Sequence, residues 1–80
     1  MAENLKEEIL DLMAEILEVS ADELEDDTAV GDIETWDSLH HLLIIAAIEK
    51  KYDIHFTPDI LIDIEDVADL IRETGRCIGA

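Results

Sequence analysis

The sequence predicts an all-α fold: a bundle of three main helices plus one short helix, with a long loop between the first and second helices. Apolar residues recur at helical spacing in several segments, and helix-capping residues precede most of them. Three of the 80 residues are aromatic, so the core must consist mainly of aliphatic side chains. The chain length predicts one domain, residues 1–80, and a hydrophobic content of 49% is sufficient for a packed core.

Apolar residues at helical spacing, with charged and mostly acidic residues between them, predict an amphipathic first helix. This helix is expected to end near Val19. Asn4, with a glutamate three residues later, is expected to cap it. Ser20 and Glu23 predict a second cap, a short helical turn and a buried Leu24. The apolar positions of the first helix are Leu5, Ile9, Leu12, Met13, Ile16 and Leu17.

The second helix follows a loop, predicted from Glu25 to Trp36, in which the helical periodicity fails. This helix is expected to begin at Asp37 or Ser38 and to end near Tyr52. At about 100° per residue, one side of it should enter the core while the other faces outward. The outward side is either a partner-docking patch or a surface that neighbouring loops cover. We assign Ile44, Ile45, Ile48 and Tyr52 to the core side, and Leu39, Leu43, Ala46, Ala47 and Lys50 to the outward side.

Two shorter segments complete the predicted bundle. Thr57 and Pro58 predict the start of a short third helix, because proline suits the first helical turn. Asp63 is expected to cap a last helix that Gly75 ends. Cys77 lies beyond the segments with helical periodicity and is expected to be an incidental thiol near the end of the chain. Because it is the only cysteine, no internal disulfide is possible.

The charge of the chain restricts its partners. Twenty-two acidic and five basic residues give a formal net charge of −17. Such a surface repels nucleic acids, anionic membranes and other copies of itself, so we expect a monomer that attracts basic patches on proteins. The start of the chain has neither a basic segment nor an apolar stretch typical of a signal peptide, and we expect a cytoplasmic protein.

The histidines predict neither a metal site nor catalysis. His40 and His41 are adjacent, so on a helix they diverge instead of converging on one ion. His55 and Cys77 lie elsewhere in the sequence. A serine nucleophile would also need an oriented base and an oxyanion hole, for which a small helical bundle offers little concave space.

Ser38 stands where the long loop meets the second helix, so its hydroxyl is expected to be exposed. The unpaired N–H groups and partial positive charge of a helix N-terminus favour an attached phosphate. Asp37 could cap the helix and help to fix the serine. Taken alone, however, an Asp-Ser pair before a helix is also typical of a simple cap.

The whole chain resembles the acyl carrier protein family. The resemblance rests on Asp37-Ser38-Leu39 near mid-chain, the apolar second helix, the segment Tyr52-Asp53-Ile54-His55-Phe56 and the segment Asp66-Val67-Ala68-Asp69-Leu70-Ile71. It implies that a phosphopantetheinyl transferase moves the 4′-phosphopantetheine arm of coenzyme A onto Ser38, with Asp37 and Leu39 completing the attachment motif. The thiol of the arm would then carry an acyl or aminoacyl group as a thioester, and the carrier itself would catalyse nothing. The implied partners are a loading ligase and downstream acyl-transferring enzymes of lipid, polyketide or related biosynthesis.

The second helix departs from the familiar fatty-acid carriers of this family, which present acidic residues along it. In this chain, Glu49 is the one acid among the matching positions, which also hold His40, His41, Leu43 and Lys50. We therefore expect a specialised carrier that docks through Leu39, Leu43, Ala46 and Lys50. Two alternatives stay open: an aminoacyl or D-alanyl-type carrier, and a non-carrier acidic helical interaction module in which Ser38 is only a helix cap.

Overall fold

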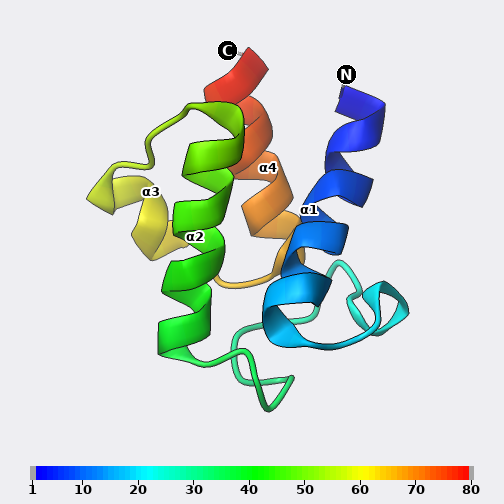
Figure 1. The fold of residues 1–80 in the computed structure, drawn as a ribbon. Helices are drawn as coiled ribbons and strands as arrows, with labels where there is room; N and C mark the ends of the chain where they lie inside the picture. Colours follow the sequence, from blue (N-terminus) through cyan, green and yellow to red (C-terminus); the bar gives the residue numbers. More distant parts are fainter. Residues whose placement is uncertain (1, 80) are drawn as a thin grey trace.

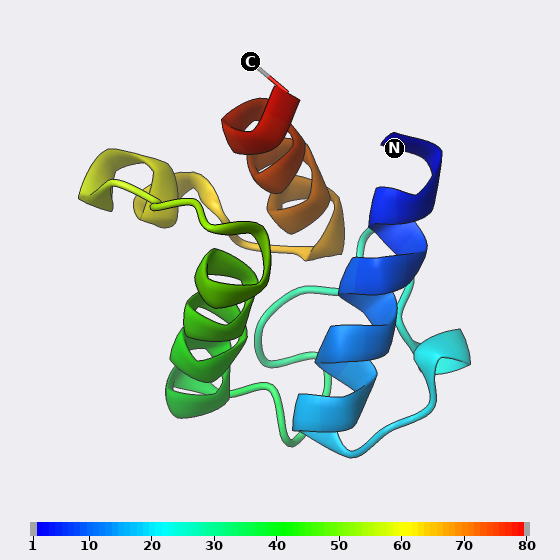
Figure 2. The same ribbon diagram turned by 45° about the horizontal axis from the view of Figure 1, so that its top comes forward.

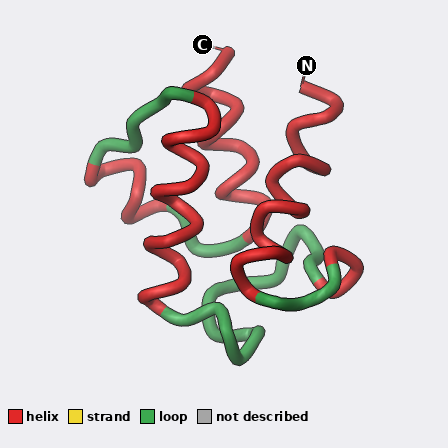
Figure 3. The backbone as a smooth tube through the Cα atoms, viewed as in Figure 1, coloured by secondary structure: helices red, strands yellow, loops and turns green. Residues whose placement is uncertain are grey.

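The computed structural model describes residues 2–79 and consists of helices joined by loops (Figure 1). Within this range no strand is formed, and two isolated β-bridges are the nearest approach to one (Figure 3). The predicted all-α fold is confirmed. Its elements are α1 (Ala2–Leu17), the 3₁₀ turn η1 (Ala21–Glu23), α2 (Ser38–Tyr52), the short α3 (Pro58–Asp63) and α4 (Val67–Gly79).

The three longer helices surround a common core, and α3 lies to the side of α2 (Figures 1 and 2). The start of α1 and the end of α4 lie at the same end of the bundle (Figure 1). The long loop between η1 and α2 crosses the opposite end, where α2 begins. The arrangement therefore presents the N-terminus of α2 at the loop-covered end of the molecule.

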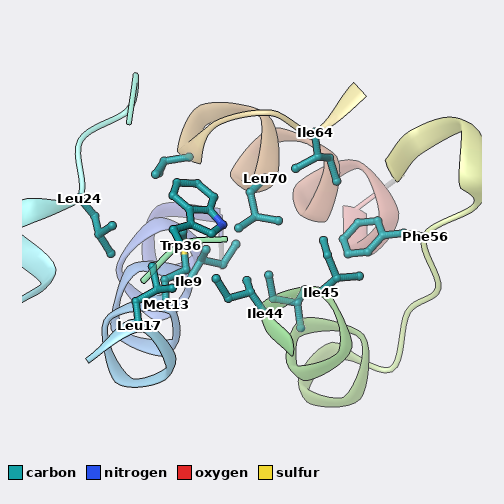
Figure 4. Packing of buried hydrophobic residues seen from close by; sticks show 12 residues of the cluster. Ile9, Met13, Leu17, Leu24, Trp36, Ile44, Ile45, Phe56, Ile64 and Leu70 are labelled. Carbon is teal, nitrogen blue, oxygen red and sulfur yellow. The ribbon is translucent and has the colours of Figure 1, made fainter. Parts of the chain in front are cut away.

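The core is aliphatic apart from two aromatic residues, as the composition predicts. Trp36, from the loop that precedes α2, is fully buried and lies near Ile9 and Met13 of α1 and Leu70 of α4 (Figure 4). Partly buried side chains from all four helices pack around this cluster. The buried apolar residues are Ile9, Met13, Leu17, Leu24, Trp36, Ile44, Ile45, Ile48, Phe56, Ile64, Val67 and Leu70.

The long loop is held by backbone hydrogen bonds to the start of α4. The first N–H groups of a helix have no acceptor within the helix itself. Here Val67 N donates to Thr28 O at 3.0 Å, and Ala68 N donates to Asp26 O at 3.0 Å. In return, Val30 N donates to Glu65 O at 3.1 Å. The loop thus replaces the missing acceptors of α4 while α4 fixes the path of the loop.

Several local predictions are confirmed. Ser20 and Glu23 form the expected reciprocal capping box at η1, and Leu24 is buried. The Thr57 side chain caps α3, with Pro58 in its first turn. The junction of the loop with α2 also lies where the sequence predicts it, since Asp37 is the N-cap of that helix.

The predicted bounds of α1 and α4 are wrong. Helix α1 begins at Ala2, so Asn4 lies within the helix and not at its N-cap position. Asp63 is the last residue of α3, and Asp66 caps α4 instead, because its Oδ1 accepts from Asp69 N at 2.8 Å. Gly75 does not end α4, which continues to Gly79. Cys77 is consequently a helical residue that packs partly buried against the core, and not a thiol beyond the last helix.

Candidate functional site

The N-terminus of α2 is fixed by the carboxylate of Asp37. This residue has extended backbone angles, and its Oδ1 accepts from His40 N at 2.9 Å. That hydrogen bond, together with a side-chain contact to His40, holds the pKa of Asp37 below its usual value. Ser38 follows as the first residue of the helix, and it is exposed. Because Asp37 supplies the capping oxygen, the cap does not require the Ser38 hydroxyl.

The last residues of the loop connect this N-terminus to the core. Trp36 is 0% exposed, and its carbonyl accepts from Gly31 N at 3.0 Å. The hydroxyl of Thr35 donates to Leu17 O at 2.8 Å, which ties the loop to the last carbonyls of α1. Gly31 has a φ of 97°, a left-handed conformation that suits glycine and turns the loop back toward Trp36. Ser38 is therefore an exposed residue two positions after a fully buried one.

Two histidines in the first turn of α2 make specific contacts that the sequence did not reveal. His40 Nδ1 lies 2.8 Å from Asp37 Oδ1. His41 Nδ1 accepts a hydrogen bond from the indole nitrogen of Trp36 at 3.1 Å. The third histidine, His55, lies at the other end of α2, with Nδ1 3.4 Å from Glu49. The three histidines thus enter three separate pairs.

The outward side of α2 carries a row of exposed aliphatic side chains next to Ser38. Leu39 and Leu43 are 63% and 48% exposed, as expected from the helical spacing. Leu42, which the helical spacing assigned to neither side, is 60% exposed and joins them. Ala46 and Lys50 are exposed on the same helix, whereas Ala47 is half-buried and does not belong to the outward surface.

The core side of α2 is as predicted, and it is held at its far end as well. Ile44, Ile45 and Ile48 are buried, while Tyr52 is half-buried. The hydroxyl of Tyr52 donates to Glu8 Oε1 at 2.6 Å, linking α2 to α1. Burial and this carboxylate together raise the pKa of the phenol. Helix α2, which presents Ser38, is therefore held at both of its ends.

Among residues 2–79, no cluster of three or more histidine, cysteine, aspartate or glutamate side chains has the arrangement of a metal site. Within the same range, no helix has the length and apolar character that crossing a bilayer requires.

Comparison with known proteins agrees with this geometry. A family model described as "Phosphopantetheine attachment site" matches residues 7–73. The fold is similar to the solution NMR structure of a holo acyl carrier protein from Geobacter metallireducens, with a TM-score of 0.83 and 24% sequence identity. That match covers 92% of this chain and 85% of the other. No curated protein matched the sequence.

The residues at the start of α2 fit a covalently attached phosphopantetheine. An exposed hydroxyl is available to form the phosphodiester, and the helix N-terminus favours the negative charge of the phosphate. Asp37 lies beside it, but its carboxylate is engaged with His40 and the helix backbone. Members of a phosphopantetheine attachment-site family are non-catalytic carriers that hold the group covalently and depend on partner enzymes such as a phosphopantetheinyl transferase. Since the family model covers residues 7–73, the chain belongs to this family.

Proposed function

We propose that this protein carries acyl or aminoacyl groups on a phosphopantetheine arm attached to Ser38, and that it serves a dedicated set of enzymes. The observation that carries the proposal is the exposure of Ser38 as the first residue of α2, beside a cap that Asp37 supplies. In the modification, the Ser38 oxygen gains a bond to phosphorus, its proton passes to a base, and the nucleotide half of coenzyme A leaves. Once bound, the arm supplies a terminal thiol that holds the cargo as a thioester.

The chain contains one other serine, which makes a useful comparison. Ser20 is also exposed, and it caps η1. Its side chain, however, is occupied as the acceptor of the Asp22 N–H at 3.3 Å. The element that it caps is three residues long, whereas α2 has 15 residues and a correspondingly larger partial charge at its N-terminus. Both differences favour Ser38 as the attachment residue.

The alternative in which Ser38 is only a helix cap is less well supported, because another residue makes the cap. Asp37 makes the capping hydrogen bond to His40 N, so Ser38 is placed one residue inside the helix. An interaction module without an arm would need no exposed hydroxyl at this position. A carrier needs one, and the match of the chain to an attachment-site family supports that reading.

The exposed row on α2 supports a docking role for Leu39, Leu43, Ala46 and Lys50. These side chains lie in the helix that begins at Ser38, so a partner that reaches the arm also meets this surface. The leucines of this surface are about half exposed or more. They favour a partner with an apolar groove over a partner that binds carboxylates alone. Leu43→Glu should leave the fold intact, because the side chain is 48% exposed, and should weaken transfer of cargo by the partner. A large loss of stability in this variant would mean that Leu43 belongs to the core.

Intact-mass analysis tests the attachment directly. The purified chain is treated with coenzyme A and a phosphopantetheinyl transferase of broad specificity, alongside Ser38→Ala and the matched control Ser20→Ala. We expect the wild type and Ser20→Ala to gain the mass of one arm and Ser38→Ala to gain none. Modification of Ser38→Ala would refute the assignment. Mass spectrometry of the protein from its native cell would then distinguish an acyl from an aminoacyl cargo.

A further inference from the structure

Two side-chain pairs enclose the start of α2, one inside the other. In the inner pair, Asp37 Oδ1 lies 2.8 Å from His40 Nδ1. In the outer pair, the indole N–H of Trp36 donates to His41 Nδ1 at 3.1 Å. The residues between the members of the inner pair are Ser38 and Leu39. The proposed attachment residue is therefore bracketed on both sides by paired side chains.

The outer pair is the one that reaches the core. Trp36 is fully buried, and its ring centroid lies 5.9 Å from that of His41. A buried indole N–H needs an acceptor, because leaving a buried donor unpaired costs about 1–3 kcal/mol. An indole nitrogen can only donate, so His41 Nδ1 must be the unprotonated nitrogen of a neutral ring. Partial burial, which lowers the pKa of His41, favours the same neutral form.

This contact orients the first turn of α2. Residues three apart lie on the same side of a helix, so Ser38 and His41 are neighbours in this turn. Holding His41 against a fully buried residue fixes the rotation of the turn, and with it the direction in which the Ser38 side chain points. The side chains of Asp37 and His40 are 58% and 30% exposed, so neither member of the inner pair reaches the core as Trp36 does, and the inner pair supplies less of this constraint.

We propose that His41 is a positioning residue for the modification of Ser38: by accepting the Trp36 N–H it holds the serine in the orientation that the transferase requires. This inference rests on the proposed function. Group transfer is sensitive to such positioning, since a displacement of about 1 Å can cost about a hundredfold in rate. His41 itself touches neither coenzyme A nor the reacting oxygen in this proposal.

The test compares variants that keep or remove the acceptor. His41→Asn places an amide oxygen as many bonds from Cβ as Nδ1, whereas His41→Phe keeps a ring without an acceptor. Conversion by coenzyme A and a broad-specificity transferase is followed by intact mass, at a temperature where circular dichroism shows each variant folded. We expect His41→Phe to lose about tenfold to a hundredfold in kcat with little change in KM, and His41→Asn to stay within about threefold of the wild type. Trp36 fluorescence should change in His41→Phe and be largely restored in His41→Asn.

Several outcomes would overturn the inference. If the wild type gains the arm at Ser38 and His41→Phe gains it equally fast, His41 does not position the serine. An equal loss in His41→Asn and His41→Phe would likewise exclude the hydrogen bond as the cause. If His41→Phe does not fold, His41→Leu takes its place with the same expected loss. If the wild type gains no arm at Ser38, the proposed function is wrong, and this inference falls with it.

Discussion

Replacement of Gly75 by alanine should stabilise the protein. Gly75 lies inside α4, where alanine is favoured over glycine by about 0.8–1.0 kcal/mol. A Cβ at this position would lie 3.4 Å from Leu5 Cδ2, the flexible end of a partly buried side chain of α1. That contact is close to ordinary van der Waals distance and reduces the gain only slightly. We therefore expect a net stabilisation of about 0.5–1 kcal/mol.

Thermal denaturation followed by far-UV circular dichroism measures this effect. For a domain of 60–100 residues, 1 kcal/mol corresponds to roughly 4–8 °C in Tm. The expected gain for Gly75→Ala is thus roughly 2–8 °C. Gly31→Ala is the matched control, since Gly31 has a φ of 97° and a side chain there is strained even though the space around it is open. This control should lose about 1–2 kcal/mol.

The opposite sign would refute the reasoning. If α4 ended at Gly75, as the sequence alone predicts, the glycine would adopt a left-handed conformation and alanine would be destabilising there. A fall in the Tm of Gly75→Ala comparable to that of Gly31→Ala would favour that alternative. A gain would support a helix that continues through Gly75 and carries Cys77 against the core.

Three further predictions concern ionisation and charge. Burial lowers the pKa of His41, so below about pH 6.5 the folded state binds fewer protons than the unfolded state. The stability that the neutral ring contributes is therefore present above about pH 6.5 and is lost as the pH falls through the lowered pKa. Urea denaturation should show the advantage of the wild type over His41→Phe shrinking below pH 6.5, and a constant difference would contradict this. Tyr52→Phe should cost about 0.5–1.5 kcal/mol through the lost bond to Glu8, and a double-mutant cycle with Glu8→Ala, which removes the acceptor, should recover most of that energy as coupling. With a net charge of −17, the Tm should rise when salt or millimolar Mg²⁺ is added, so a Tm indifferent to both would show that self-repulsion is unimportant.

Local signals made the starts of α2 and α3 predictable from the sequence. Asp37 and Thr57 each cap the helix that follows them through their own side chains, and such bonds span only three residues. The start of α4 was predicted wrongly although a local cap of the same kind marks it, since Asp66 accepts from Asp69 N. The sequence offers an aspartate at both positions 63 and 66, and what separates them lies outside the segment: Val67 N and Ala68 N donate to carbonyls some forty residues earlier, contacts that leave no periodic trace in the sequence.

The candidate site was predictable only in part. Helical spacing assigned Leu39 and Leu43 to the outward side of α2, but it could not decide whether loops covered them; the structure leaves both exposed. The pairing of Trp36 with His41 was not predicted, because helical geometry shows that adjacent histidines diverge but does not show which group each of them contacts. A buried tryptophan that precedes a helix by two residues, with a histidine in the first turn, is the signal that could have revealed it.

The start of α2 satisfies two demands that conflict in most surface segments. A modification site must be exposed to an enzyme, yet exposed residues receive little ordering from packing. In this chain the order comes from the neighbours of Ser38: Trp36 is buried, and Asp37 and His41 are each bound to another side chain or backbone group. A serine on an unconstrained loop would have to be ordered at every encounter, at about 1–2 kcal/mol for each backbone residue fixed. Because the first turn of α2 is ordered before any partner arrives, a transferase acting on Ser38 would meet little of that cost.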